Sequence, residues 1–257
     1  MSGTSTPSNL KQLLIQHGFT SMKAEIWAKF VHHVVRVYWQ AADQLLEPSN
    51  WTCFKQKLGA LGKPKNSRAG TVTQVPLEDA ITSEIGYLAE QIRIALPSDH
   101  FLRKHEVCFS YETLIPSSIR AGRHSKKVDF RVYSLYPDAP ELAIEAKPVA
   151  TLNDISSQYL GVRGMGCFFD LDSAYTAGPL GAMLAYNLTS DGSSMQSNVL
   201  DALYRYQPKP LHIHHSVSIP DCGLAHSSHH DRAAWNLQPI TILHLERNFP
   251  VDVYQQT

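Results

Sequence analysis

The sequence predicts an α/β protein with a mixed central β-sheet and an additional helical region at its N-terminal end. Residues 10–46 repeat apolar side chains at helical spacing, with Trp27, Val31 and Val34 on one face. From residue 76 onward, an amphipathic helical segment precedes three strand-like segments and then a mixture of both types. The chain has 257 residues, 43% of them hydrophobic, so it can bury a sizeable core.

The first 75 residues are expected to form a helical region and a linker. Residues 1–9 are rich in Ser, Thr and Pro, which is typical of a disordered tail. A second short helix is expected over residues 51–61. Residues 62–76 mix Gly, Pro, Ser and basic residues without periodicity, which indicates a mobile linker. We therefore distinguish an N-terminal region, residues 1–75, from a main domain, residues 76–257.

The main domain should begin with a helix over residues 76–96, because Ile81, Ile85 and Leu88 share one face. A hairpin connection is expected at residues 136–140, "YPDAP". The other predicted elements are, in order, strands at 106–110, 127–135 and 142–148, a helix at 153–160, a buried strand within 178–188, a helix at 194–206, and strands at 212–219 and 240–247.

Composition and charge narrow the function classes. Lys and Arg together number 23, as do Asp and Glu, so no global positive field is available to hold nucleic acid. The four cysteines are widely spaced and form no CxxC pair, and no signal peptide pattern is seen, so we expect a cytoplasmic protein. The longest apolar stretch near the N-terminus, residues 30–39, is too short to span a membrane.

Charged residues interrupt two apolar strands in the segment "KKVDFRVYSLYPDAPELAIEAKPVA". In the first strand, Asp129 lies on the face opposite Val128 and Phe130. In the second strand, Glu145 and Lys147 share a face and lie about 6 to 7 Å apart along the strand.

If the two strands pair as a hairpin, these three charges can converge. Two carboxylates at close range repel unless a cation neutralises them, and Mg²⁺ prefers such oxygen ligands. A bound divalent ion beside a lysine can promote phosphodiester hydrolysis. Asp129, Glu145 and Lys147 are therefore candidate catalytic residues.

The arrangement resembles the PD-(D/E)xK, or restriction-endonuclease-like, nuclease superfamily. Asp129 is followed by fifteen residues and then by Glu145-Ala146-Lys147 on an apolar strand, and the preceding helix fits the family's αβββαβ core. The resemblance implies a Mg²⁺-dependent nuclease acting on DNA, with Mn²⁺ as a substitute. Asp129, Glu145 and the backbone carbonyl of Ala146 would hold the metal, and Lys147 would position or activate water.

The resemblance also implies contributions from two helices. A Glu from the first core helix often joins the site, and we expect Glu84 in this role because it borders the apolar face, with Glu78 as the fallback. The second core helix often supplies a polar residue that meets the substrate. Gln158 and Tyr159 stand at about that position, although both could be ordinary residues of the helix surface.

The resemblance makes restriction, phage defence or mobile-element processing natural settings. Because the formal net charge is zero, we expect a helicase, an ATPase or a second copy of the chain to help deliver the DNA. The competing interpretation of the triad is a surface ion pair, although the apolar flanks of "LAIEAKPV" favour a central strand.

Two other function classes remain. The first is a non-catalytic interaction subunit that retains the fold. The second is a zinc-stabilised binding module at the His-rich end, where "HIHH" (residues 212–215) and "CGLAHSSHH" (residues 222–230) place six histidines near Cys222. The spacing matches no structural zinc motif, so we favour polar loop histidines there; contact with phosphate or a partner is a further option.

Overall fold

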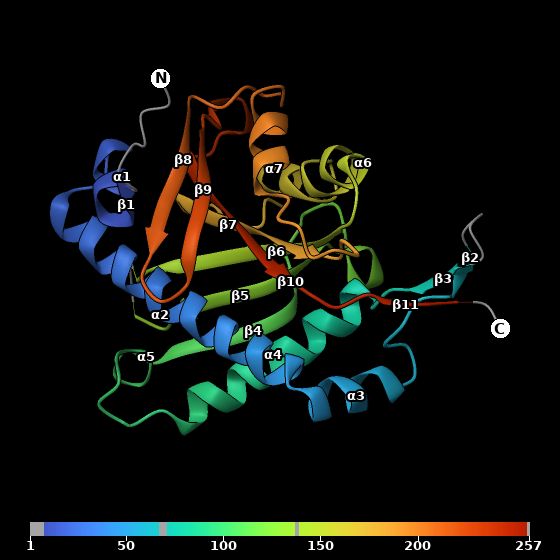
Figure 1. Cartoon of the computed structure of the whole chain (residues 1–257). Helices are drawn as coiled ribbons and strands as arrows, with labels where there is room; N and C mark the ends of the chain where they lie inside the picture. Colours follow the sequence, from blue (N-terminus) through green and yellow to red (C-terminus); the bar gives the residue numbers. More distant parts are fainter. Residues whose placement is uncertain (1–7, 67–70, 137–138, 256–257) are drawn as a thin grey trace, which may run out of the picture.

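An eight-stranded mixed β-sheet forms the centre of the computed structural model, which describes residues 8–66, 71–136 and 139–255 (Figure 1). The strand order is β1-β8-β9-β10-β7-β6-β5-β4. The strands are β1 (Ser8–Asn9), β4 (Val107–Leu114), β5 (Lys127–Ser134), β6 (Glu141–Val149), β7 (Leu180–Asn187), β8 (His212–Ile219), β9 (Gly223–His230) and β10 (Ile240–Asn248). The α/β class is thus confirmed.

Helices cover both faces of this sheet. One face packs against the N-terminal helices and α4, and the other against the short helices that follow β6 and β7. The helices are α1 (Leu10–Gln16), α2 (Ser21–Leu46), α3 (Pro48–Gln56), α4 (Glu78–Ala95), α5 (Phe101–Lys104), α6 (Leu152–Asp154) and α7 (Gln196–Leu203). Four single-turn helices complete the set: η1 (Gly122–His124), η2 (Ile155–Tyr159), η3 (Met165–Phe169) and η4 (Ala233–Trp235).

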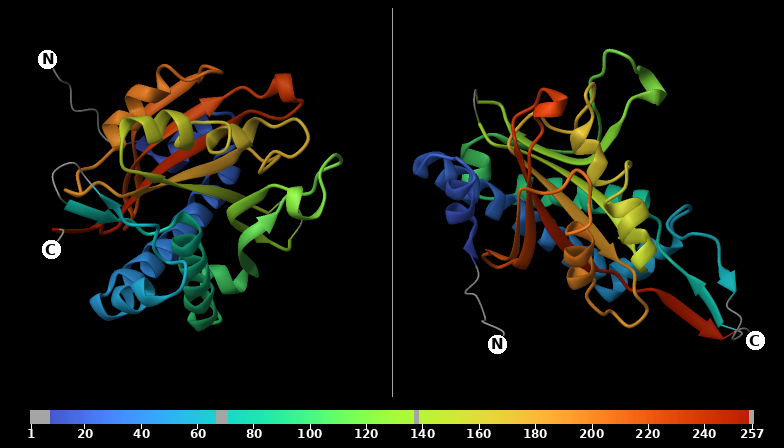
Figure 2. Two further views of the ribbon diagram at one scale, coloured as in Figure 1. Left: turned by 90° about the vertical axis from the view of Figure 1, so that its right-hand side faces the viewer. Right: turned by 90° about the horizontal axis from the view of Figure 1, so that it is seen from above.

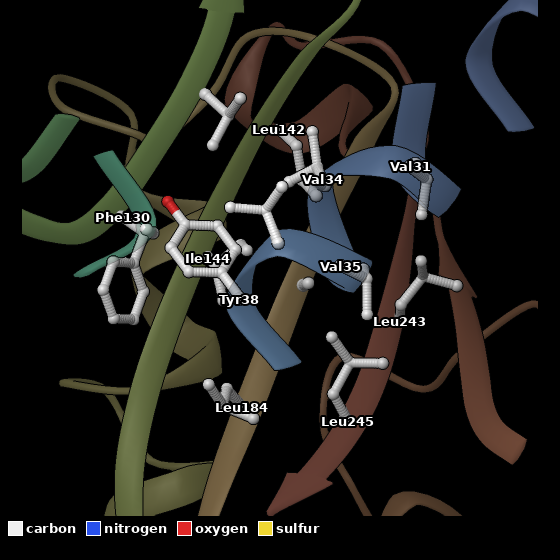
Figure 3. Packing of buried hydrophobic residues seen from close by; sticks show 14 of the residues in the cluster. Val31, Val34, Val35, Tyr38, Phe130, Leu142, Ile144, Leu184, Leu243 and Leu245 are labelled. Atoms are coloured by element: carbon white, nitrogen blue, oxygen red, sulfur yellow. The ribbon is translucent and has the colours of Figure 1, made fainter. Parts of the chain in front are cut away.

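The long helix α2 supplies much of the first core layer. Its N-terminus is capped by the Thr20 side chain, which accepts a hydrogen bond from the Lys23 backbone N–H. It ends at Glu47 because the following Pro48 disfavours helical dihedral angles at the residue before it. Figure 3 shows Val31, Val35 and Tyr38 directed at the strands. Each fully buried side chain of this size stabilises the fold by about 1.5–3 kcal/mol.

The N-terminal region does not pack apart from the main domain. Buried residues of α1, α2 and α3 belong to the same hydrophobic cluster as the sheet and α4. In addition, β1 pairs in parallel with β8, so residues 8–9 extend the sheet. The expected boundary after residue 75 therefore does not coincide with a break in the packing, and the disordered tail predicted for residues 1–9 is wrong for its last two residues; residues 1–7 lie outside the described part.

The linker predicted for residues 62–76 is also partly wrong. Strands β2 (Lys65–Asn66) and β3 (Thr71–Gln74) pair with each other, and β3 pairs with β11 (Asp252–Gln255) near the C-terminus. They form a separate three-stranded sheet because the extended backbone finds hydrogen-bonding partners on both sides of β3. Residues 67–70 of this segment are outside the described range.

The helices and strands predicted from α4 to β7 are present in the expected order, with α5, η1 and η3 in addition. Strands β4, β5 and β6 pair antiparallel, and β7 joins β6 in parallel after the crossover through α6 and η2. The turn expected at residues 136–140 includes residues 137–138, which lie outside the described part. Strand β9 was not predicted at all, although it lies between β8 and β10. In the described residues, no helix combines the length and the apolarity needed to cross a membrane.

Candidate active site

Strands β5 and β6 separate at the point where the predicted charges lie. Their backbone pairing runs from Tyr133 opposite Glu141 to Phe130 opposite Ile144. Beyond this pair, the Asp129 carboxylate accepts a hydrogen bond from the Ala146 backbone N–H at 2.7 Å. The side chain thus takes over a ladder hydrogen bond, which fixes its carboxylate beside β6.

Lys147 lies at the centre of the charged cluster. Its Nζ atom is 2.8 Å from Glu145 Oε1 and 3.9 Å from Asp129 Oδ2. It also donates a hydrogen bond to the Ala146 carbonyl oxygen at 2.7 Å. Glu145 is only 3% exposed and Lys147 9%, and β6 lies between β5 and β7. The geometry excludes the alternative of an exposed surface pair and confirms that β6 is a central strand.

Glu78, at the first position of α4, completes the cluster. Its Oε1 atom is 2.5 Å from Lys147 Nζ, and ligand atoms of Glu78, Asp129 and Glu145 all lie within 4.8 Å of one another. A carboxylate in the first helical turn is stabilised by the positive end of the helix dipole.

The prediction of Glu84 at the site is wrong, because the fallback residue Glu78 occupies that position instead. Glu84 lies six residues further along α4, about 9 Å along the helix axis and on a different face. Its carboxylate pairs with Lys57 of the α3–β2 connection at 2.5 Å. Glu78, at the N-terminal end of α4, reaches Lys147 on β6, whereas Glu84 does not. The position along the helix therefore decides which carboxylate joins the cluster.

Charge is unbalanced in the cluster. Three carboxylates and one ammonium group sum to −2 when all are ionised. Burial raises the pKa of Glu145 well above its usual value, and the nearby Asp129 raises it further. Burial likewise raises the pKa values of Asp129 and Glu78, against the opposing effect of Lys147. For Lys147, burial favours the neutral form, but the charges of the three carboxylates outweigh it and raise the pKa.

These residues fit a hard divalent cation. Besides the close approach of the three carboxylates, the Oε2 atom of Glu145 is buried and has no hydrogen-bonding partner. An unpaired buried carboxylate oxygen is costly, and a cation would satisfy it. A charge of +2 would also balance the cluster, and oxygen ligands are those that Mg²⁺ and Mn²⁺ accept. The ammonium group of Lys147 neutralises part of this charge through Oε1 of Glu78 and Oε1 of Glu145, but it does not contact Oε2 of Glu145.

The cluster lies in the wall of a cavity of about 1150 Å³. Gln158, predicted to meet the substrate, is exposed and lines this cavity, although its side-chain amide donates to Asp154. Tyr159 does not: it is fully buried, and its hydroxyl lies 3.3 Å from the Met183 carbonyl oxygen. The prediction for Tyr159 is wrong because the next residue of a helical turn points about 100° away, here into the core.

Basic residues that line the same cavity were missed by sequence reasoning. Arg120 and Lys126 line it from the β4–β5 connection, Lys127 from the start of β5, and Arg163 from the segment after η2. The signal was present, since residues 115–127 contain four Lys or Arg residues, one His and no acidic residue. By contrast, none of the described residues within 62–76, the basic segment noted in the sequence, lines the cavity.

The C-terminal histidines are not loop residues, so that interpretation is wrong. They lie on β8 and β9, where buried polar groups pair with one another. Ser228 Oγ lies 2.8 Å from Nε2 of His230 on the same strand and 2.8 Å from Nε2 of His244 on β10. In the described part of the chain, Glu78, Asp129 and Glu145 form the only group of three ligating side chains close enough to share a metal ion. The geometry therefore gives no support to a zinc site there.

The buried histidines should make stability depend on pH. Burial and then the neighbouring His229 lower the pKa of His230 from 6.5 to about 3. Between these values the unfolded chain binds a proton that the folded chain excludes. Stability is thus complete above about pH 6.5 and falls as the pH decreases towards 3, by roughly 1 kcal/mol per pH unit for one such group.

Urea unfolding between pH 7 and pH 4.5 measures this effect. The His230→Gln variant should show a shallower pH dependence than the parent, whereas His124→Gln, at an exposed position, should leave the slope unchanged. The buried carboxylates of the cluster act in the opposite direction, but they are common to all three proteins. Parallel curves for parent and His230→Gln would contradict the prediction.

Comparisons with known proteins add no relative: no family model, no curated protein and no solved structure matches this chain.

Proposed function

We propose that the protein is a metal-dependent nuclease of the PD-(D/E)xK type that hydrolyses DNA phosphodiester bonds. The observation that carries the proposal is the convergence of Glu78, Asp129, Glu145 and Lys147 in one cavity wall, with one buried carboxylate oxygen unpaired. Burial and the neighbouring Asp129 also raise the pKa of Glu145 well above its usual value, and perturbed carboxylates of this kind cluster at functional sites.

The order of elements supports the same class. A helix, three antiparallel strands, a helical crossover and a parallel fourth strand follow one another from α4 to β7. This is the succession that the PD-(D/E)xK resemblance implies, and it places Asp129 on the second of these strands and Glu145 and Lys147 on the third.

Asp129, Glu145 and Glu78 would hold Mg²⁺ or Mn²⁺, together with the Ala146 carbonyl oxygen. A bound ion of this kind lowers the pKa of a ligated water and polarises a phosphoryl oxygen. Lys147 contacts Oε1 of Glu78 and Oε1 of Glu145, and it leaves Oε2 of Glu145 open to a metal ion. Its ammonium group can then donate hydrogen bonds to the phosphate and hold it against the carboxylates. Gln158 can donate to the substrate from the cavity wall.

The balanced overall charge supports a shared role in DNA delivery. With 23 basic and 23 acidic side chains, the chain has no general affinity for a polyanion. A helicase or ATPase subunit, or a second copy of this chain, would supply the remaining contacts. Restriction or phage defence is the setting that such a complex would serve.

The second candidate is a non-catalytic subunit with a nuclease-like fold. The contacts of Lys147 favour it, because one ammonium group binds two carboxylates and a carbonyl oxygen and so stabilises the cluster without metal. In that case the cluster serves only to hold α4 against β6.

A cleavage assay with the purified protein separates the two candidates. Labelled single-stranded and duplex DNA should be cleaved in Mg²⁺ or Mn²⁺, and EDTA should stop the reaction. RNA of the same sequence serves as the comparison substrate. If no nucleic acid is cleaved in either metal, alone or with a partner subunit, the non-catalytic candidate stands and the nuclease proposal fails.

A further inference from the structure

The connection between β4 and β5, residues 115–126, projects from the body of the protein beside the candidate site (Figure 2). Together with Lys127, the first residue of β5, it forms what we term the basic loop. The loop carries Arg120, Arg123, Lys126 and Lys127 and has no acidic residue. Several of its side chains line the same cavity as the carboxylates.

The base of the basic loop is anchored rather than loose. The Asp172 carboxylate accepts hydrogen bonds from the hydroxyls of Ser117 and Ser118 and, at 2.9 Å, from the Ser118 backbone N–H. Asp170 pairs with Lys126 at 2.7 Å. Arg120 donates to the Ser173 hydroxyl at 2.8 Å. Two aspartates thus fix the loop to the segment that follows η3.

Two cations of the basic loop, Arg123 and Lys127, are not anchored by an aspartate of the described chain. Arg123 and Lys127 are exposed, and among the described residues neither forms a salt bridge. Lys127 precedes Asp129 by two residues, so both side chains leave β5 on the same face, about 6 to 7 Å apart. A cation held at that distance from the carboxylates is positioned for a neighbouring phosphate of the strand that they would act on.

Cations of the basic loop share the cavity with the carboxylate cluster. Ligand atoms of Glu78, Asp129 and Glu145 lie within 4.8 Å of one another. The same cavity is lined by the cations Arg120, Lys126, Lys127 and Arg163, and also by the acidic residues Asp79, Glu112 and Asp170. A nucleic acid strand has one phosphate to present to the carboxylate wall and flanking phosphates to present to cations. A small phosphate ester would not need this second group of cations.

We propose that the basic loop is a phosphate clamp. It holds the nucleic acid backbone next to the scissile phosphate, on the side where Lys127 lies. The proposal rests on the proposed nuclease function and deepens it, because it assigns the substrate as a polynucleotide rather than a small phosphodiester. Arg123 and Lys127 bind backbone phosphates, while Asp170 and Asp172 position the loop and touch no substrate.

The test is a binding titration in EDTA, which prevents metal-dependent cleavage, with fluorescein-labelled 20-base-pair DNA and anisotropy as the readout. Arg123→Ala/Lys127→Ala should weaken binding by about tenfold and reduce the slope of log K against log salt by about 2, one unit per lost phosphate contact. The matched control is Lys104→Ala/Lys209→Ala, which removes the same charge at two exposed positions that do not line the cavity.

Equal affinity and equal salt slope for the two double variants would overturn the clamp, as would a parent protein that binds no DNA. The two proposals fail separately. If the parent binds DNA through Arg123 and Lys127 but cleaves nothing in Mg²⁺ or Mn²⁺, alone or with a partner subunit, the nuclease proposal fails and the clamp proposal stands. If the Arg123→Ala/Lys127→Ala variant cleaves DNA as well as the parent does, the clamp proposal alone fails.

Discussion

Glu145→Gln is expected to abolish metal-dependent DNA cleavage, with a loss in kcat of roughly a hundredfold or more. The substitution keeps the size of the side chain but removes the charge that a divalent cation would neutralise. Glu145 is 3% exposed, and one of its carboxylate oxygens has no hydrogen-bonding partner. Single-turnover cleavage at saturating protein measures the effect.

Helix α4 offers a matched pair for the same experiment. Glu78→Gln and Glu84→Gln are identical changes on one helix, but only Glu78 belongs to the cluster. Glu78→Gln should weaken Mn²⁺ binding in a calorimetric titration and slow cleavage, whereas Glu84→Gln should behave like the parent in both. The metal assignment would be refuted if Mn²⁺ bound to Glu145→Gln and Glu78→Gln as tightly as to the parent.

Arg232→Met should destabilise the protein by about 3–5 kcal/mol. Arg232 is fully buried, and its guanidinium donates to the carbonyl oxygens of Phe168, Thr176 and Gly178 at 2.8 to 3.1 Å. Methionine fills a similar volume but leaves these carbonyls without donors. Urea unfolding at pH 7 measures the loss.

Two further variants show whether the loss of stability comes from the hydrogen bonds of the buried guanidinium. Arg205→Met removes an exposed arginine and should cost little. Arg232→Lys retains the charge but not the planar fork, so it should recover only part of the stability. Arg232 also holds the segment that carries Asp170, which pairs with Lys126 of the basic loop. Its loss should therefore loosen the basic loop and weaken DNA binding. An Arg232→Met protein as stable as Arg205→Met would contradict this account.

The central triad could be predicted because strand parity is a local property. Alternation along β5 and β6 determines which face each side chain occupies, and the apolar flanks of Glu145 indicate a central strand. Glu78 and Glu84 could not be separated in this way. Both are half-buried carboxylates of one amphipathic helix, and only the position of α4 over the sheet brings the first of them to β6.

Strand β9 shows a different limit. Its sequence, GLAHSSHH, lacks the alternation of apolar residues that predicts strands, yet Ser227, Ser228 and His230 are buried. Their burial depends on partners that are distant in sequence, such as His244 on β10 for Ser228. A buried strand that is stabilised by polar pairing cannot be recognised from its own sequence, because its partners lie elsewhere in the chain.

The place of β10 in the sheet has a consequence for the order of folding during synthesis. This strand is near the C-terminus, yet it lies inside the sheet between β7 and β9, and its Leu243 and Leu245 face α2 (Figure 3). Synthesis must therefore reach residue 248 before the part of α2 that faces β10 is covered. Contacts of such long sequence separation form slowly, so apolar side chains of this 26-residue amphipathic helix stay partly uncovered in the nascent chain until then.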